Sequence, residues 1–383
     1  MKYELIAPCH FGMEAVLKNE ILSLGYEITE VMDGRVIFAA DAAGIARANV
    51  FLRTAERILL KVGDFVAQTF DELFEGCKAI AWEEYIPADG KFWVAKAASV
   101  KSKLFSPSDI QSIIKKAMVE KLKQTYHVEW FAEDGETFPL RVFINKDRVI
   151  IGIDTSGESL HKRGYRKLVS KAPVAENLAA GLIMLTPWRE DRILVDPFCG
   201  CGTIPIEAAM IAAKIAPGMN RDFTAENWKH IVPRKCWYDA INEANDMIDM
   251  SVRPDLQGYD IDGDMIKAAK ENAELAGVAD MIHFQKRPVK ELSHPKKYGF
   301  IITNPPYGER IGEADEVKEL YADLASAMRE RLDTWSAFVI TGYADAEKLM
   351  GRKADKNRKI YNGMMKTYYY SFNGPKPPKR GNV

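Results

Sequence analysis

The fold is decided by one stretch of the 383-residue chain, Val195-Asp196-Pro197-Phe198-Cys199-Gly200-Cys201-Gly202-Thr203. The apolar run Ile193–Val195 leads into this stretch, and a helical pattern over Thr203–Ile215 follows it. Two glycines one residue apart form a turn in which a ligand can approach the backbone, since no Cβ obstructs it. A strand, a glycine-rich turn and a helix in this order predict a binding site at the carboxyl end of the strand.

The same alternation of strands and helices continues toward the C-terminus. Short apolar runs predict strands at 256–259, 281–284, 300–303 and 337–341, and an aromatic-rich run predicts a late strand at 366–372. A helical pattern separates the first two of these runs, at 264–276. Such alternation indicates a mainly parallel sheet with helices on both faces, which is the Rossmann-like α/β class.

The N-terminal half has a less regular, α+β pattern. It begins as strand, helix and strand, over residues 3–7, 11–24 and 31–39. Further strands are predicted at 57–62, 92–100 and 140–153, with helices near 70–77 and over 106–124. Ser106 and Pro107 are typical of a helix start, since serine caps the free N–H groups and proline favours the first turn.

A second acidic residue follows the next predicted strand. In Gly258-Tyr259-Asp260-Ile261-Asp262, the Asp260 carboxylate can accept both hydrogen bonds from a ribose diol. A dinucleotide site is a competing interpretation, but the third glycine of its fingerprint is replaced by Pro205. A ligand-free turn is the other alternative, and the matching Asp260 argues against it.

The cysteines and the apolar runs bound the remaining classes. Cys199 and Cys201 suggest a metal, but two ligands without partners do not form a site, so no metal is predicted. Five cysteines without paired C-x-x-C spacing favour free thiols in a reducing compartment. The longest apolar candidate, 177–188, is shorter than the ~18 residues that a membrane span needs. A cytoplasmic protein is therefore expected.

The chemistry is predicted to lie in Asn304-Pro305-Pro306-Tyr307, directly after the apolar run 300–303. Proline fixes the backbone of the turn and restricts the residue before it. The Asn304 amide oxygen and a backbone carbonyl of Asn304 or Pro305 can together accept both hydrogens of a planar exocyclic amine. The Tyr307 ring offers a flat face on which a base can stack.

These motifs carry a resemblance to a known family. DPFCGCGT, GYDID and NPPYGER, in this order and spacing, resemble class I S-adenosylmethionine (SAM)-dependent amino-methyltransferases. The stretch DTSGESLHKRGYR at 154–166, followed by Lys171-Ala172-Pro173, resembles the junction after a THUMP RNA-binding domain. Together they are similar to the RlmL/YpsC-like 23S rRNA guanine-N2 methyltransferase family.

The resemblance implies roles for particular residues. The catalytic loop would be Asn304, Pro305, Pro306 and Tyr307. The SAM-binding residues would be Pro173, Asp196, Pro197, Phe198, Cys199, Gly200, Gly202, Thr203, Asp260, Ile261 and Asn304. Pro288 stands where relatives often carry an aspartate for the adenine amine, so backbone groups are expected to replace that contact.

Charge is segregated along a chain whose net charge is only -1. Residues 97–124 carry six lysines against two carboxylates, and residues 156–175 carry five cations against one, a net +4 each. Residues 352–383 carry nine cations against one carboxylate, a net +8. Phosphate contacts are dominated by Lys and Arg. The predicted RNA-binding residues are Lys101, Lys103, Lys115, Lys162, Arg163, Arg166 and Lys167.

The combined prediction is a SAM-dependent enzyme that methylates the N2 amine of a guanosine in RNA, with 23S rRNA as the expected substrate. Its expected parts are a ferredoxin-like domain at 1–60, a THUMP RNA-binding domain at 61–160, a methyltransferase domain at 161–373 and a disordered tail at 374–383. The alternatives are a tRNA guanine-N2 methyltransferase, a DNA adenine-N6 methyltransferase and a non-catalytic RNA-binding assembly factor.

Overall fold

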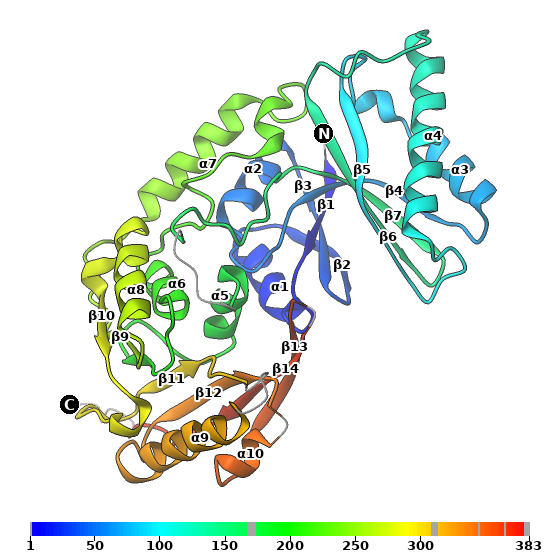
Figure 1. Ribbon diagram of the computed structural model, residues 1–383. Coiled ribbons are helices and arrows are strands. Elements are labelled where there is room, and N and C mark those ends of the chain that lie inside the picture. The colour runs from blue at the N-terminus through cyan, green and yellow to red at the C-terminus, as the bar shows by residue number, and fades with distance from the viewer. Residues whose placement is uncertain (1, 167–173, 308–312, 344, 364, 379–383) are drawn as a thin grey trace. The chain divides into compact units, whose positions relative to one another are not determined.

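The computed structural model describes residues 2–166, 174–307, 313–343, 345–363 and 365–378 (Figure 1). The chain forms two compact units. The first contains Met1–Pro8, Lys18–Leu160 and Arg221–Glu243. The second contains Cys9–Leu17, His161–Asn220 and Ala244–Val383. No helix in the described ranges is long and apolar enough to cross a membrane.

The first unit is built on one seven-stranded sheet in the order β2-β3-β1-β4-β7-β6-β5. Its strands are β1 (Tyr3–Pro8), β2 (Glu27–Met32), β3 (Arg35–Ala40), β4 (Leu59–Val66), β5 (Lys91–Val100), β6 (Thr137–Asn145) and β7 (Arg148–Asp154). β1 pairs with β4 through Leu5 opposite Leu60, so strands from residues 1–60 and from residues 61–160 share a single sheet. Among these described strands, β5 and β6 are the parallel neighbours, and the other pairs are antiparallel.

Capping side chains mark the starts of three helices in this half. α2 (Ala42–Phe51) is capped by Asp41, and α3 (Phe70–Lys78) by a reciprocal capping box between Thr69 and Glu72. α4 (Pro107–Tyr126) begins with Ser106 as its cap, as expected. α1 (Glu14–Ser23) begins three residues later than the sequence pattern indicates.

Residues 221–243, which follow α6 (Thr203–Ala212) in the sequence, belong to the first unit. Trp228 of this segment stacks on Phe138 of β6 with 4.9 Å between ring centroids, and its Nε1 donates to the Thr137 carbonyl at 3.0 Å. In α7 (Arg234–Met247), Glu243 pairs with Arg47 of α2 through two hydrogen bonds of 2.7 Å. The segment is thereby packed against the N-terminal sheet.

The second unit also contains a seven-stranded sheet, in the order β10-β9-β8-β11-β12-β14-β13. Its strands are β8 (Leu194–Asp196), β9 (Leu256–Asp260), β10 (Ile282–Lys286), β11 (Phe300–Thr303), β12 (Ser336–Thr341), β13 (Lys356–Asn362) and β14 (Met365–Phe372). The first five strands in this order are parallel, and β14 and β13 are antiparallel additions. The predicted Rossmann-like α/β class is confirmed, as is the late aromatic strand.

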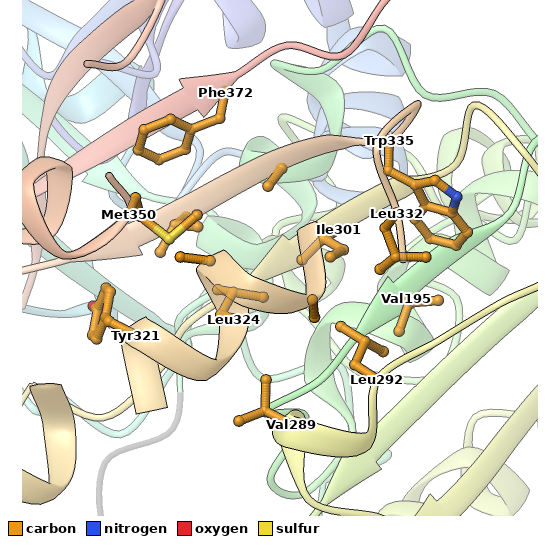
Figure 2. Close-up of a cluster of buried hydrophobic side chains, with 14 of the residues drawn as sticks. Val195, Val289, Leu292, Ile301, Tyr321, Leu324, Leu332, Trp335, Met350 and Phe372 are labelled. Atoms are coloured by element: carbon orange, nitrogen blue, oxygen red, sulfur yellow. The ribbon is translucent and has the colours of Figure 1, made fainter. Parts of the chain in front are cut away.

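The helices of this unit are α5 (Glu176–Met184), α6 (Thr203–Ala212), α8 (Gly263–Leu275), α9 (Glu313–Glu330) and α10 (Ala346–Leu349). Figure 2 shows the core between α9 and the sheet, where Leu324 of α9 lies beside Ile301 of β11. Both of these side chains are fully buried, and Trp335 closes the same cluster. Such a core holds the parallel strands rigidly and fixes the positions of their carboxyl ends.

Candidate active site

Three strand ends meet at one edge of the second sheet. β8 ends at Asp196, β9 at Asp260 and β11 at Thr303, and β8 lies between the other two as a parallel neighbour. The chain runs from β8 to β9 and β10 on one side and then crosses back to place β11 on the other side. This is the topological switch point at which open α/β sheets bind ligands. The predicted cofactor loop, Asp260 and the Asn304 loop are therefore brought to the same edge.

The glycine-rich loop between β8 and α6 needs both glycines for their backbone conformation, and Gly202 also for close packing. Gly200 and Gly202 have φ of +52° and +86°, which L side chains rarely adopt. A Cβ on Gly202 would lie 2.9 Å from the Cβ of Ala269 in α8 and 2.9 Å from the Phe284 ring in β10. The missing Cβ of Gly202 therefore allows close packing at the start of α6, and its predicted role in making room for a ligand stays a prediction.

The carboxylate of Asp260 is held in place by backbone donors. Its Oδ2 accepts from Gly200 N and its Oδ1 from Asp262 N, both at 2.9 Å. Burial raises the pKa of this carboxyl group. Each oxygen retains a further lone pair, so the group can still accept from a ribose diol. Ile261, directly beside it, is 67% exposed and offers an apolar surface on which an adenine ring can lie. These residues fit a nucleoside cofactor such as SAM.

Asp196 is committed to internal hydrogen bonds. Its Oδ1 accepts from Phe198 N at 3.1 Å and from the Thr303 hydroxyl at 2.5 Å. The side chain is 2% exposed, and this burial raises its pKa to about 7. In the described structure Asp196 joins β8 to β11. Its predicted contact with the cofactor, like those of Pro197, Cys199 and Thr203, stays a prediction.

In the loop after β11, the polar side chains of Asn304 and Tyr307 contact each other. Pro305 is buried, Pro306 is exposed, and Asn304 and Tyr307 are half-buried. The Tyr307 hydroxyl donates to the Asn304 amide oxygen. This contact was not expected from the sequence. Because an amide oxygen has two lone pairs, the bond orients Asn304 and leaves one acceptor position for a substrate amine.

Three of the predicted RNA-binding residues pair with carboxylates in the described structure, and their contact with RNA stays a prediction. Each has a carboxylate partner within the protein: Lys115 Nζ lies 2.7 Å from Glu133, Arg163 Nε 3.5 Å from Glu207 and Arg166 Nη2 2.8 Å from Glu176. Arg163 is only 3% exposed. A buried cation needs a paired anion, so the pair of Arg163 with Glu207 has a structural role.

The other predicted RNA-binding residues divide into two groups. Lys101, Lys103 and Lys162 are exposed, and their contact with RNA stays a prediction. Lys167 and the predicted cofactor residue Pro173 lie outside the described residues.

Two residues that contribute to this region were not identified from the sequence. One is Thr303, for which no signal exists beyond its place before Asn304. The other is Glu207, fully buried in α6, whose Oε1 also accepts from the Tyr165 hydroxyl at 3.1 Å. A lone carboxylate in the otherwise apolar helix TIPIEAAMIA was a usable signal, because such a charge must find a partner.

Cys199 and Cys201 are both buried, and burial raises the pKa of the Cys199 thiol. Within the described ranges, no group of three or more His, Cys, Asp or Glu side chains is arranged to hold a metal ion.

Family models match most of the chain. Residues 163–371 match the RMKL-like methyltransferase domain, residues 4–59 the RlmL ferredoxin-like domain, and residues 67–154 the THUMP domain. A protein of Bacillus subtilis (strain 168), "Putative RNA methyltransferase YpsC", is 47% identical over 99% of this chain and 98% of its own length. The ribosomal RNA large subunit methyltransferase K/L of Cellvibrio japonicus is 32% identical over 95% of this chain, which spans only 50% of that protein.

Solved structures share the same architecture. SMU.472, solved in complex with S-adenosylhomocysteine (SAH), is 42% identical with a TM-score of 0.90, covering 98% of this chain and 99% of its own. A protein of Listeria monocytogenes, described as a predicted N6-adenine-specific DNA methylase, is 43% identical with a TM-score of 0.91. That match covers 98% of this chain and 97% of the Listeria protein.

Proposed function

This chain belongs to the RMKL-like methyltransferase family, and from that premise we propose that it methylates the exocyclic N2 amine of a guanosine in RNA with SAM as the methyl donor. The substrate proposed is 23S rRNA, and the reaction is placed in the cytoplasm. RNA as the substrate class is supported by the match of residues 67–154 to the THUMP domain and by the RNA methyltransferase names of relatives. Because the chain spans about half the length of the K/L relatives, their rRNA activity is carried over as part of the proposal.

One observation carries the proposal: an amide acceptor on a proline-containing turn lies at the same sheet edge as a carboxylate that can accept from a ribose diol. Asn304 follows β11 and Asp260 ends β9, with β8 between these strands. The Asp260 carboxylate would bind the ribose of SAM, and the Asn304 amide oxygen would bind the amine that receives the methyl group. An edge that binds a nucleoside and an amine together suits group transfer between them.

The chain's contribution to the reaction is alignment. When bound, SAM would supply a methyl group on a sulfonium, whose carbon–sulfur bond breaks as the nitrogen–carbon bond forms, so that the neutral thioether SAH leaves. Asn304 Oδ1 and the Pro305 carbonyl would accept the two hydrogens of the target amine and thereby turn its lone pair toward the methyl carbon. Well-oriented reacting groups reach effective molarities of ~10⁵–10⁸ M, so positioning supplies much of the rate enhancement.

The same two acceptors also stabilise charge. As the amine nitrogen forms its new bond to carbon it becomes positive, and fixed dipoles already aimed at its hydrogens favour that state. The loop needs no base before transfer, because the nitrogen becomes acidic only afterwards and can then release its proton to water. The Tyr307 ring would stack on the base while its hydroxyl keeps Asn304 oriented.

The decisive experiment is methyl transfer in vitro. The purified protein is incubated with labelled SAM and one nucleic acid in each reaction: 23S rRNA, tRNA or DNA, each taken from a strain lacking the gene. Nucleoside mass spectrometry then identifies the methylated base. N2-methylguanosine in 23S rRNA is the expected product. Label in tRNA alone would show that the substrate is tRNA and not 23S rRNA. N6-methyladenine in DNA alone would favour the DNA methylase alternative.

A pair of asparagine variants tests the role of the loop. Asn304→Ala is expected to lower kcat by at least ~10²-fold, the loss typical of one transition-state hydrogen bond, with SAM affinity changed less than a few-fold. Asn19→Ala, an exposed asparagine in α1, is the matched control and should behave as wild type. A normal rate for Asn304→Ala would remove this residue from its role. A wild-type enzyme that binds RNA but transfers no methyl group to any substrate would favour the assembly-factor alternative.

A further inference from the structure

The hairpin of β13 and β14 carries alternating aromatic and basic side chains on one of its faces. Lys359 lies opposite Tyr368, and Tyr361 lies opposite Lys366. Residues two apart on a strand point to the same side, so these four side chains share one face. The Lys359 Nζ lies 5.0 Å from the Tyr361 ring centroid, and the Lys366 Nζ lies 5.2 Å from that of Tyr368.

A fifth side chain, Phe11, is added by the N-terminal segment of the same unit. Its ring meets Tyr361 edge to face, with 6.0 Å between centroids, and Lys359 Nζ lies 5.9 Å from it. We call Phe11, Lys359, Tyr361, Lys366 and Tyr368 the hairpin face. It joins segments from opposite ends of the sequence.

Phe11 is held in place by the backbone around it. Gly12 has φ of +92°, and a Cβ there would lie 2.6 Å from the Lys359 carbonyl oxygen. Arg358 Nη1 donates to the Gly12 carbonyl at 2.9 Å, and His10 Nδ1 lies 3.1 Å from the Tyr361 carbonyl oxygen. Only glycine permits this close approach, so the position of the Phe11 ring against β13 is built into the fold.

The lysines of the hairpin face differ in their surroundings from Lys115, Arg163 and Arg166. No carboxylate of the described residues forms an ion pair with Lys359 or Lys366. Both lysines are exposed, Phe11 is 39% exposed, and Tyr361 and Tyr368 are half-buried. Positive charge interleaved with aromatic rings that are at least partly accessible is the composition that binds single-stranded nucleic acid.

The hairpin face begins beside the catalytic loop. A Cβ built on Gly342, which follows β12, would lie 3.6 Å from Cδ2 of Tyr307 and 3.6 Å from the carbonyl oxygen of Lys366. The start of β14 and the Asn304–Tyr307 loop therefore approach one another at this glycine. A strand of RNA whose base lies at Asn304 would have its neighbouring nucleotides within reach of the hairpin face.

We propose that the hairpin face binds unpaired nucleotides next to the target base, stacking bases on Phe11, Tyr361 and Tyr368 and contacting phosphates with Lys359 and Lys366. The proposal rests on the proposed function in that it takes RNA as the substrate. A base must leave its stack to reach a methyltransferase pocket, and this cost is larger in a duplex than in a loop. A surface that binds the flanking nucleotides in unpaired form would offset that cost.

The test measures RNA affinity separately from methyl transfer. Binding of a short, fluorescently labelled oligouridine and of a duplex RNA is titrated at several salt concentrations. The probe proteins are wild type, the double variant Lys359→Gln/Lys366→Gln, and Phe11→Leu. The control is Lys267→Gln/Lys235→Gln, which removes the same charge from two exposed helix lysines. SAM affinity and melting temperature are recorded for each variant to verify folding.

The double variant is expected to bind oligouridine about tenfold more weakly and to lower the slope of log K against log salt by ~1.4, or ~0.7 per lost phosphate contact. Phe11→Leu should weaken oligouridine binding severalfold and leave duplex binding unchanged, because only unpaired bases can stack on the ring. The control should retain wild-type affinity.

Two results would overturn this proposal while leaving the proposed function intact. One is wild-type affinity and slope for the double variant in an enzyme that still methylates RNA. The other is an equal loss of oligouridine and duplex binding in Phe11→Leu. The proposed function fails by a different result, the absence of label in any RNA given to the wild-type enzyme.

Discussion

The hydroxyl of Thr303 donates a 2.5 Å hydrogen bond to Oδ1 of Asp196, and this bond joins the ends of β11 and β8 where the catalytic loop and the cofactor loop begin. The same carboxylate oxygen accepts from Phe198 N in the cofactor loop. Asp196 therefore couples the position of one loop to the position of the other. The spacing between the methyl donor and the amine acceptor would depend on this buried contact.

Replacing Thr303 by valine should slow the reaction without weakening the binding of the cofactor. Valine keeps the shape and β-branching of threonine but cannot donate to Asp196. We expect kcat to fall about tenfold with SAM affinity within twofold, since small misplacements of reacting groups are costly. Thr367→Val, a buried threonine of β14 whose hydroxyl donates to the Ile360 carbonyl, is the matched control. Equal rates for the two variants would contradict the coupling.

Asp196 should also give stability a distinctive pH dependence. Burial raises its pKa from 3.8 to about 7, so between these values the folded chain holds a proton that the unfolded chain has released. The free energy of unfolding must then fall as pH rises through this window. Asp196→Asn stays neutral, so the difference in unfolding free energy between variant and wild type should grow in favour of the variant from pH ~4 to ~7. Urea melts across this range measure it, and parallel curves would refute it.

The buried pair of Arg163 and Glu207 should behave as a structural element and not as an RNA contact. Arg163→Met strands the Glu207 carboxylate in the core, which costs about 3–5 kcal/mol of unfolding free energy. Adding Glu207→Leu removes the stranded charge and should restore most of that loss. Chemical denaturation of the single and double variants tests this.

RNA binding by the double variant separates the two roles. If Arg163 has no phosphate contact, the restored Arg163→Met/Glu207→Leu protein should bind 23S rRNA within twofold of wild type and with the same salt slope. A slope lowered by ~0.7–0.9 would return Arg163 to the RNA interface.

Two glycines with positive φ separate backbone strain from crowding. Gly277 has φ of +72° with nothing within 4 Å of the position that a Cβ would occupy, whereas Gly202 is crowded by Ala269 and Phe284. Gly277→Ala should therefore lower the unfolding free energy by about 1–2 kcal/mol, because alanine is strained at positive φ. Gly202→Ala should lower the unfolding free energy by the same backbone strain and by a further ~1–3 kcal/mol, because the added methyl group overpacks the site. Equal losses, measured by thermal or chemical melting, would show that α6 can shift to accept a methyl group.

Much of the second unit was predictable because its signals are local. Short apolar runs predicted β9, β10, β11 and β12 closely, and Gly200, Asp260 and Asn304 each lie at or just after the end of a strand. In a parallel sheet, residues that follow strands lie at one edge, so their gathering there also follows from the sequence. The hydrogen bonds among these residues could not be predicted, because they depend on which strands are neighbours and on side-chain rotamers.

The sequence by itself determined the fold class, the switch-point motifs and the segregation of charge, since strand length, helical periodicity and glycine turns act over a few residues. Only the tertiary structure decided which charges are neutralised. Arg163 and Arg166 look like Lys359 and Lys366 in the sequence, yet within the described residues the first two meet buried carboxylates and the last two do not. The structure likewise assigned 221–243 to the first unit and 9–17 to the second. These outcomes depend on contacts between residues far apart in the chain, and a carboxylate's position in space is what determines whether a cation is neutralised.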